Sequence, residues 1–256
     1  MHYNANGGTI TSDEFKLKDN LVHYISNDSK VGQTWTYGST PTYGLTDCAT
    51  FGLSKPGYFF KGWGTTATGG TIYSQVDTTI SATDLNSYIK TGDCAVTLYA
   101  IWEKIELVSD TDAVIDNENG LIFGINEGFE NIEDYVSLSA DGAEIEFTPN
   151  ENGNGTGSVV TIVDDGEEIA SYTIVIFGDY NGDGIIDTED TSYFASIANF
   201  ELFDCYEEGN EHLFMAADIN GDGAVDNMDE EDMYAVANFE AYIDQKADGT
   251  YRVVRY

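Results

Sequence analysis

Two segments of this chain follow the same twelve-residue pattern of oxygen-bearing side chains and glycines, and a repeat of this kind leaves few folds open. The pattern reads DYNGDGIIDTED from Asp179 and DINGDGAVDNMD from Asp218. A loop that winds around Ca²⁺ supplies oxygen side chains at its first, third, fifth, ninth and twelfth positions and a backbone carbonyl at its seventh. The sequence therefore predicts two calcium ions. The predicted ligands are Asp179, Asn181, Asp183, Ile185, Asp187 and Asp190 in the first loop, and Asp218, Asn220, Asp222, Ala224, Asp226 and Asp229 in the second.

Other positions of the loops agree with this prediction. Gly184 and Gly223 stand where the chain must turn sharply, and glycine reaches backbone conformations that a side chain would penalise. A pair of acidic, Asx-rich turns without metal is the alternative, but two full matches favour calcium. The twelfth position is Asp190 in one copy and Asp229 in the other, where sensor loops have Glu. The shorter side chain favours a static structural site over a switch.

Each loop is expected to lead into one helix, and neither loop is expected to have an entering helix, because a strand at 173–177 precedes Asp179. The helical period places Phe194 and Ile197 on the core face of the first helix, with Met233 and Val236 as their counterparts in the second. A second stripe is too apolar in places to be idle surface, so it is a candidate binding face. It consists of Glu189, Tyr193, Ser196 and Phe200, repeated as Met228, Asp232, Ala235 and Phe239.

The duplicated loop and helix without entering helices resembles the dockerin module of cellulosome-type assemblies, over about 179–243. The resemblance implies a secreted bacterial protein, a calcium-dependent fold and a partner, the cohesin module of a scaffolding protein. Dockerins contact cohesin through the tenth and eleventh loop positions and through helix positions beyond them. The partner-binding residues expected here are Thr188, Glu189, Tyr193, Ser196 and Phe200, and Asn227, Met228, Ala235 and Phe239. Because the two sets differ, we expect one preferred binding face; packing of these residues on the neighbouring β-module is the alternative.

Residues 105–178 carry the signals of a β-rich block. Strands are expected at 121–123, 144–147, 158–163 and 169–177, with glycines and amides between them that suit tight turns. A small β-sandwich is the expected fold. No linker separates this block from Asp179, so we expect the two to be rigidly docked. The arrangement resembles the X-modules that precede some dockerins.

Residues 1–104 also read as mostly β, with a short helix expected within 81–90. The segments YNANGG from Tyr3, KPGYFFKGW from Lys55 and LYAIW from Leu98 resemble the Listeria-Bacteroides repeat, although the stretch between Gly8 and Lys55 is longer than usual. That resemblance implies a β-grasp-like extracellular spacer or adhesion unit. Tyr58, Phe60, Trp63 and Trp102 are expected in its core rather than on a carbohydrate-binding platform.

Charge narrows the range of partners. The chain has 46 acidic and 10 basic residues, a net charge of −36, which repels phosphate backbones and anionic lipid headgroups. We therefore expect no nucleic acid as partner and no membrane insertion, and no stretch is long and apolar enough to span a bilayer. No arrangement of residues suggests a nucleophile with its base or a paired acid site, so no enzyme is expected. The three cysteines leave open whether Cys48 and Cys94 form a disulfide.

The sequence thus predicts a multidomain, mainly β protein with a C-terminal α module. The predicted domains are a β-grasp-like domain at 1–104, an X-module-like β-sandwich at 105–178 and a dockerin at 179–256. The expected function is non-catalytic, calcium-dependent protein binding in a secreted or cell-surface assembly. A carbohydrate-binding or adhesin fragment, acting on a polysaccharide or cell-surface component through residues 1–104, is the first alternative. A calcium sensor that opens an apolar groove is the second.

Overall fold

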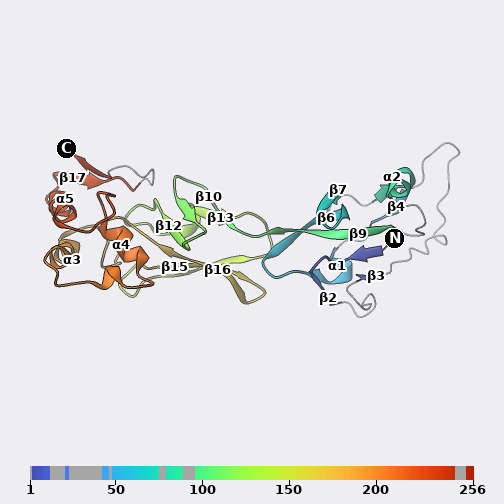
Figure 1. Ribbon diagram of the computed structural model, residues 1–256, viewed down its shortest axis with the longest axis horizontal. Helices are drawn as coiled ribbons and strands as arrows, with labels where there is room; N and C mark the ends of the chain where they lie inside the picture. The colour runs from blue at the N-terminus through green and yellow to red at the C-terminus, as the bar shows by residue number, and fades with distance from the viewer. Residues whose placement is uncertain are drawn as a thin grey trace. The chain divides into compact units, whose positions relative to one another are not determined.

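The computed structural model describes residues 2–11, 21–22, 42–45, 48–74, 79–88, 96–245 and 252–256. The chain folds as two compact units, Met1–Ile105 and Glu106–Tyr256 (Figure 1). It is mainly β, with its longest helices near the C-terminus, as predicted. The second and third predicted domains share the second unit. None of the helices in the described segments has the length and apolar character of a membrane span. Cys94, one half of the disulfide considered above, lies outside the described residues.

The first unit is built on a five-stranded mixed sheet. Its order is β3 (Leu21–Val22), β1 (His2–Asn4), β9 (Thr97–Lys104), β6 (Tyr58–Thr66) and β7 (Gly69–Ser74), with β1 parallel to β9. Two short ribbons pair β2 (Thr9–Ile10) with β5 (Leu53–Ser54) and β4 (Thr42–Gly44) with β8 (Thr79–Ser81). Helices α1 (Cys48–Phe51) and α2 (Ala82–Ser87) complete the unit, and α2 is the short helix that was expected.

Aromatic side chains fill the core of this unit. Phe60 and Trp63 are buried against Tyr3 and Phe51, as predicted for the first two. Trp102 is half-buried, and its indole N–H donates to the Ala5 carbonyl oxygen at 2.9 Å. No aromatic side chain whose exposure the structure describes in this unit is exposed.

The second unit begins with β-structure. A five-stranded sheet has the order β11 (Val114–Asp116), β12 (Leu121–Phe123), β16 (Glu167–Ile174), β15 (Val159–Asp164) and β14 (Glu144–Thr148). A separate ribbon pairs β10 (Leu107–Ser109) with β13 (Val136–Leu138), and a 3₁₀ turn η2 covers Ile132–Asp134. All four predicted strands are present, although β16 ends at Ile174, three residues earlier than expected.

The helices follow the two loops. They are α3 (Thr188–Ala198) and α5 (Asn227–Ala237), which pack against each other, with the 3₁₀ turn η3 (Asp204–Tyr206) and α4 (Glu211–Ala217) between them. The presence of α4 corrects one expectation, because the second loop does have an entering helix, which ends directly before Asp218. Strands β17 (Ala241–Ile243) and β18 (Val253–Arg255) form a C-terminal hairpin.

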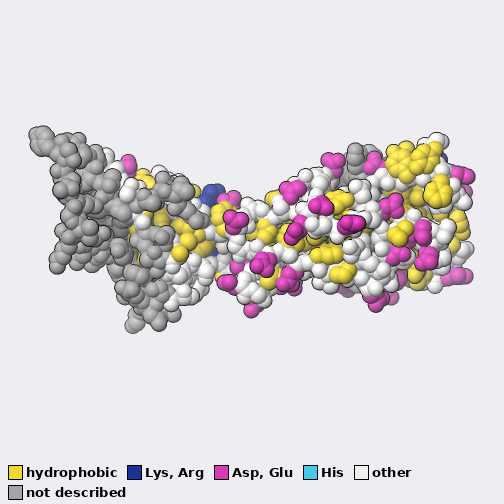
Figure 2. Space-filling model, turned by 180° about the vertical axis from the view of Figure 1, so that it is seen from behind, with side chains coloured by type: hydrophobic (Ala, Val, Ile, Leu, Met, Phe, Trp, Pro, Cys, Tyr) yellow, Lys and Arg dark blue, Asp and Glu magenta, His cyan; other side chains and the backbone are white. Residues whose placement is uncertain are grey.

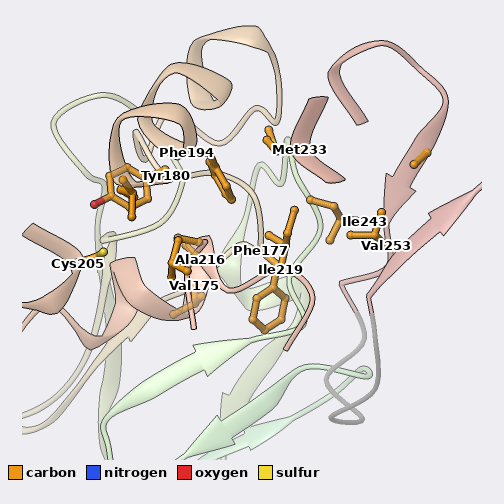
Figure 3. Close-up of a cluster of buried hydrophobic side chains, with 14 of the residues drawn as sticks. Val175, Phe177, Tyr180, Phe194, Cys205, Ala216, Ile219, Met233, Ile243 and Val253 are labelled. Atoms are coloured by element: carbon orange, nitrogen blue, oxygen red, sulfur yellow. The ribbon is translucent and has the colours of Figure 1, made fainter. Parts of the chain in front are cut away.

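One apolar cluster joins the sheet to the helices. Val175 and Phe177, which follow β16, lie among Phe194 of α3, Met233 of α5 and Ile243 of β17 (Figure 3). All five are 8% exposed or less. Because the segment after β16 runs straight from this cluster into Asp179, the start of the first loop is fixed to the core.

Candidate metal centres

The first loop is organised around the carboxylate of Asp179, which is fully buried. Its Oδ1 accepts a hydrogen bond from the Gly182 N–H at 3.0 Å, and its Oδ2 accepts one from the Gly184 N–H at 3.2 Å. A further N–H, that of Thr156, donates to Oδ2 at 2.8 Å. The first loop position therefore holds the chain in a turn around its own carboxylate.

The twelfth position closes the same loop. Asp190, also fully buried, accepts from the N–H groups of Tyr180 and Asn181 with Oδ1, at 2.8 and 3.2 Å. Its Oδ2 accepts from the Asp187 N–H at 3.0 Å. Asp187 in turn caps α3 by accepting from the Glu189 N–H at 2.7 Å. This reciprocal cap satisfies N–H groups at the start of the helix, so one pair of carboxylates both ends the loop and begins α3.

The second loop repeats this geometry. Asp218 accepts from the N–H groups of Asp222 at 3.1 Å and Gly223 at 3.0 Å. Asp229 is fully buried and accepts from the N–H of Asn220 at 3.2 Å and that of Asp226 at 3.0 Å. The same reciprocal cap, between Asp226 and Asp229, begins α5. The sequence repeat is thus a structural repeat.

The middle positions also match. Asn181 Oδ1 accepts from the Asp183 N–H and Asn220 Oδ1 from the Asp222 N–H, both at 2.8 Å. Asp183 accepts from the Ile185 N–H at 2.8 Å, and Asp222 accepts from the N–H of the residue at the same loop position, Ala224, at 3.0 Å. The ten predicted side-chain ligands therefore lie on two short, tightly wound segments.

Burial destabilises the ionised form of these carboxylates. Desolvation is the main cause that raises the pKa of Asp190 to about 7 and that of Asp179 to about 6. Desolvation likewise raises the pKa of Asp229 to about 6. No basic side chain is among the partners of these three groups in the described part of the chain. A bound cation would stabilise their ionised forms, and an all-oxygen donor set suits a hard cation such as Ca²⁺.

Across the described ranges, no group of three or more His, Cys, Asp or Glu side chains is placed to hold a metal ion. The predicted donor set of the first loop also includes the amide oxygen of Asn181 and the main-chain carbonyl oxygen of Ile185, which lie outside these four side-chain types.

The expected partner-binding residues divide into three groups. Phe200, Met228 and Phe239 are 78%, 57% and 87% exposed, and Tyr193 is 37% exposed. Thr188, Glu189 and Asn227 are also exposed, and Ser196 is half-buried. Ala235 requires a correction, since it is only 5% exposed and packs in the same apolar cluster as Ala241 and Val253. The C-terminal hairpin contacts α5.

The sequence interpretation missed the contacts that the β-structure makes with the first loop. Thr156 and Asn152 donate hydrogen bonds to it from the turn 150–157, and Glu127 accepts one from the Ile186 N–H at 3.0 Å. The glycine- and asparagine-rich composition of 150–157 signals a turn but does not indicate what it touches.

Comparison with known proteins adds no assignment. No family model, no curated protein and no solved structure matches the chain.

Proposed function

We propose that the C-terminal part of this protein is a calcium-stabilised protein-interaction module of the dockerin kind, whose partner is a cohesin module. The observation that carries the proposal is the repeated loop geometry, in which Asp190 and Asp229 are buried, accept main-chain N–H groups of their own loops and lack a basic partner in the described chain. Two calcium ions would neutralise these groups and tie each loop to its helix. The β-structure at 106–178 would act as an X-module-like support, and the first unit as a β-grasp-like spacer at the cell surface.

The proposed partner face is formed by the exposed side chains of the repeat. Phe200 and Phe239 extend from equivalent positions after α3 and α5, and Met228 lies in the first turn of α5. Large exposed apolar side chains contribute strongly to binding energy when a partner desolvates them. The buried position of Ala235 supports the expectation that the two halves of the face are not equivalent.

Calorimetric titration against a panel of cohesin modules tests the proposal. We expect binding in calcium and its loss in chelator. The variant Asp179→Ala/Asp218→Ala should lose both the calcium response and helical circular dichroism, because calcium binding and folding are linked. A control variant Glu167→Ala/Glu168→Ala removes two exposed carboxylates of β16 and should change neither. Binding that ignores the chelator, or no binding to any cohesin, would refute the proposal.

No observation favours the carbohydrate-binding alternative. A sugar platform needs a row of exposed aromatic rings. In the first unit, those aromatic side chains whose exposure the structure describes are buried or half-buried.

A further inference from the structure

Two turns of the β-structure cover the first calcium loop from outside. From the turn 150–157, the Thr156 N–H donates to Asp179 Oδ2 at 2.8 Å, and Asn152 Nδ2 donates to the Asn181 carbonyl oxygen at 2.6 Å. We call residues 150–157 the cover turn. Its contacts reach both a ligand side chain and the main chain of the loop.

A second turn, at 127–128, also contacts this loop. The Gly128 N–H donates to the Gly184 carbonyl oxygen at 2.8 Å, and Glu127 Oε2 accepts from the Ile186 N–H at 3.0 Å. Both contacts are to main-chain groups at the centre of the loop. The path of the loop backbone is therefore set by neighbours as well as by its own carboxylates.

The cover turn approaches the first loop so closely that its positions 153 and 155 must be glycine. A Cβ on Gly155 would overlap the Asp179 carboxylate and the Gly184 nitrogen, and a Cβ on Gly153 would overlap the Asp183 main chain. The approach is equally close from the side of the loop, because a Cβ on Gly182 would overlap the Thr156 carbonyl oxygen. Two backbones in direct contact leave little freedom to either.

The cover turn is itself held firmly. Thr156, which is fully buried, exchanges hydrogen bonds through Oγ1 with the Ile176 N–H and carbonyl oxygen, at 3.0 and 3.1 Å. Asn150 Nδ2 donates to the Thr156 carbonyl oxygen at 2.8 Å, and Ser158 Oγ accepts from the Gly155 N–H at 3.2 Å. The turn is thus fastened to the segment that leads into Asp179.

Within the described residues, the second loop has no comparable cover. Gly221, Asp222, Gly223 and Asp226 are exposed, whereas the equivalent residues of the first loop are buried or half-buried. A Cβ on Gly223 would meet nothing within 4 Å. Among the described residues, two side chains outside this loop donate to it: the Tyr206 hydroxyl to the Val225 carbonyl oxygen at 3.1 Å and Arg252 Nη1 to the Asp218 carbonyl oxygen at 3.3 Å.

We propose that the cover turn makes the first loop a tight, slowly exchanging calcium site and leaves the second loop as the weaker, exchangeable one. The inference rests on the calcium binding proposed above. A loop whose main chain is already held loses less conformational entropy when it closes on an ion. Release of that ion also requires movement of packed neighbours. Calcium concentration would then act on the module through the loop that begins α5.

Calcium calorimetry of the full chain, with stopped-flow release into a fluorescent chelator, tests the difference between the sites. We expect two affinity classes separated by about tenfold or more, with slower release from the tighter class. Matched variants at the fifth position of each loop assign the two affinity classes to the two loops. Asp183→Ala should remove the tight class, and Asp222→Ala should remove the weak class.

Variants of the cover turn test its role. Gly155→Ala should weaken the tight class by about tenfold or more, because the added methyl group separates the two backbones. Asn152→Ala removes one contact without adding atoms and should shift the same class in the same direction. Glu151→Ala, in the same turn with an exposed side chain, is the matched control and should change neither class.

The outcomes separate the inference from the proposed function. A wild-type chain that binds no calcium refutes both. Two sites of equal affinity and release rate, or a tight class that is lost in Asp222→Ala, refute the inference while calcium binding stands. A tight class unchanged in both Gly155→Ala and Asn152→Ala also refutes it.

Discussion

Two aromatic residues at equivalent positions of the repeat hold an unfavourable backbone conformation. Phe200 has φ 59° and Phe239 has φ 58°, each directly after the C-cap asparagine of its helix. A residue with a Cβ destabilises the fold by about 1–2 kcal/mol in this left-handed region, and helices usually end there in glycine. Both rings are also largely exposed, so packing does not compensate for the strain. Partner contact would account for an aromatic residue at both positions.

Replacement of Phe239 by glycine separates stability from binding. Phe239→Gly should leave the free energy of unfolding in calcium unchanged or raise it by up to about 1 kcal/mol, because the strain is relieved and little burial is lost. Cohesin affinity should fall. Urea denaturation and calorimetry measure the two effects. Phe203→Gly is the control, since Phe203 is 53% exposed but has φ −135° and no strain to relieve. A loss of more than about 1 kcal/mol in Phe239→Gly would indicate that the ring is part of the fold.

Among the elements, the C-terminal hairpin fastens the end of the module to its start. Gln245 accepts from the Phe177 N–H at 2.9 Å and donates to the Phe177 carbonyl oxygen at 2.8 Å. The Arg252 guanidinium lies 3.8 Å from the centroid of the Phe177 ring. Arg255 pairs with Asp232 of α5 at 2.7 Å. The hairpin thereby holds α5 and the segment before the first loop in one body.

The Arg255 pair should contribute measurably to stability. Asp232 is 3% exposed, so Arg255→Ala leaves a buried carboxylate without this cation and should lower the free energy of unfolding by about 1–2 kcal/mol. The Arg255 side chain is 55% exposed, and solvent screening keeps the effect below that of a fully buried pair. Asp232→Ala/Arg255→Ala should recover part of the loss in a double-mutant cycle. Strictly additive effects would show that the two groups do not interact.

In the whole molecule, negative charge is concentrated in one unit. Residues 106–256 contain 37 acidic and three basic residues, whereas residues 1–105 contain nine and seven. Acidic side chains are spread over the visible face of the second unit (Figure 2). Self-repulsion of this size opposes a compact state, and bound divalent cations relieve it. Calcium should therefore matter to the second unit and not to the first.

Calcium removal should accordingly act on one unit. In differential scanning calorimetry, chelator should lower the unfolding temperature of the second unit and leave the unfolding temperature of the first unit unchanged. At a free calcium concentration 100 times the dissociation constant, one site stabilises by about 2.7 kcal/mol. Sodium chloride at matched ionic strength controls for simple screening and should not replace calcium. Identical scans in calcium and chelator would contradict the proposed metal sites.

Local sequence patterns predicted much of the secondary structure. The strands of the second unit and the starts of α3 and α5 were predictable because alternation and capping residues act over a few neighbouring positions. The two loops were predictable for the same reason, since each winds around carboxylates within twelve residues. Whether calcium occupies them stays a prediction.

Long-range packing determined the contacts between segments that are distant in the sequence. Thr156 lies 23 residues before the Asp179 carboxylate that it contacts, and Ala235 is buried in a cluster that includes Ala241 and Val253 of the hairpin after its own helix. Neither contact produces a periodic pattern in the sequence, because the burial of these residues depends on which distant segment packs against them. The twelve-residue repeat made the two loops equal in sequence. The difference between them, one covered by the β-structure and one open to solvent, arises in the folded chain, where the turns at 127–128 and 150–157 reach the first loop from distant parts of the sequence.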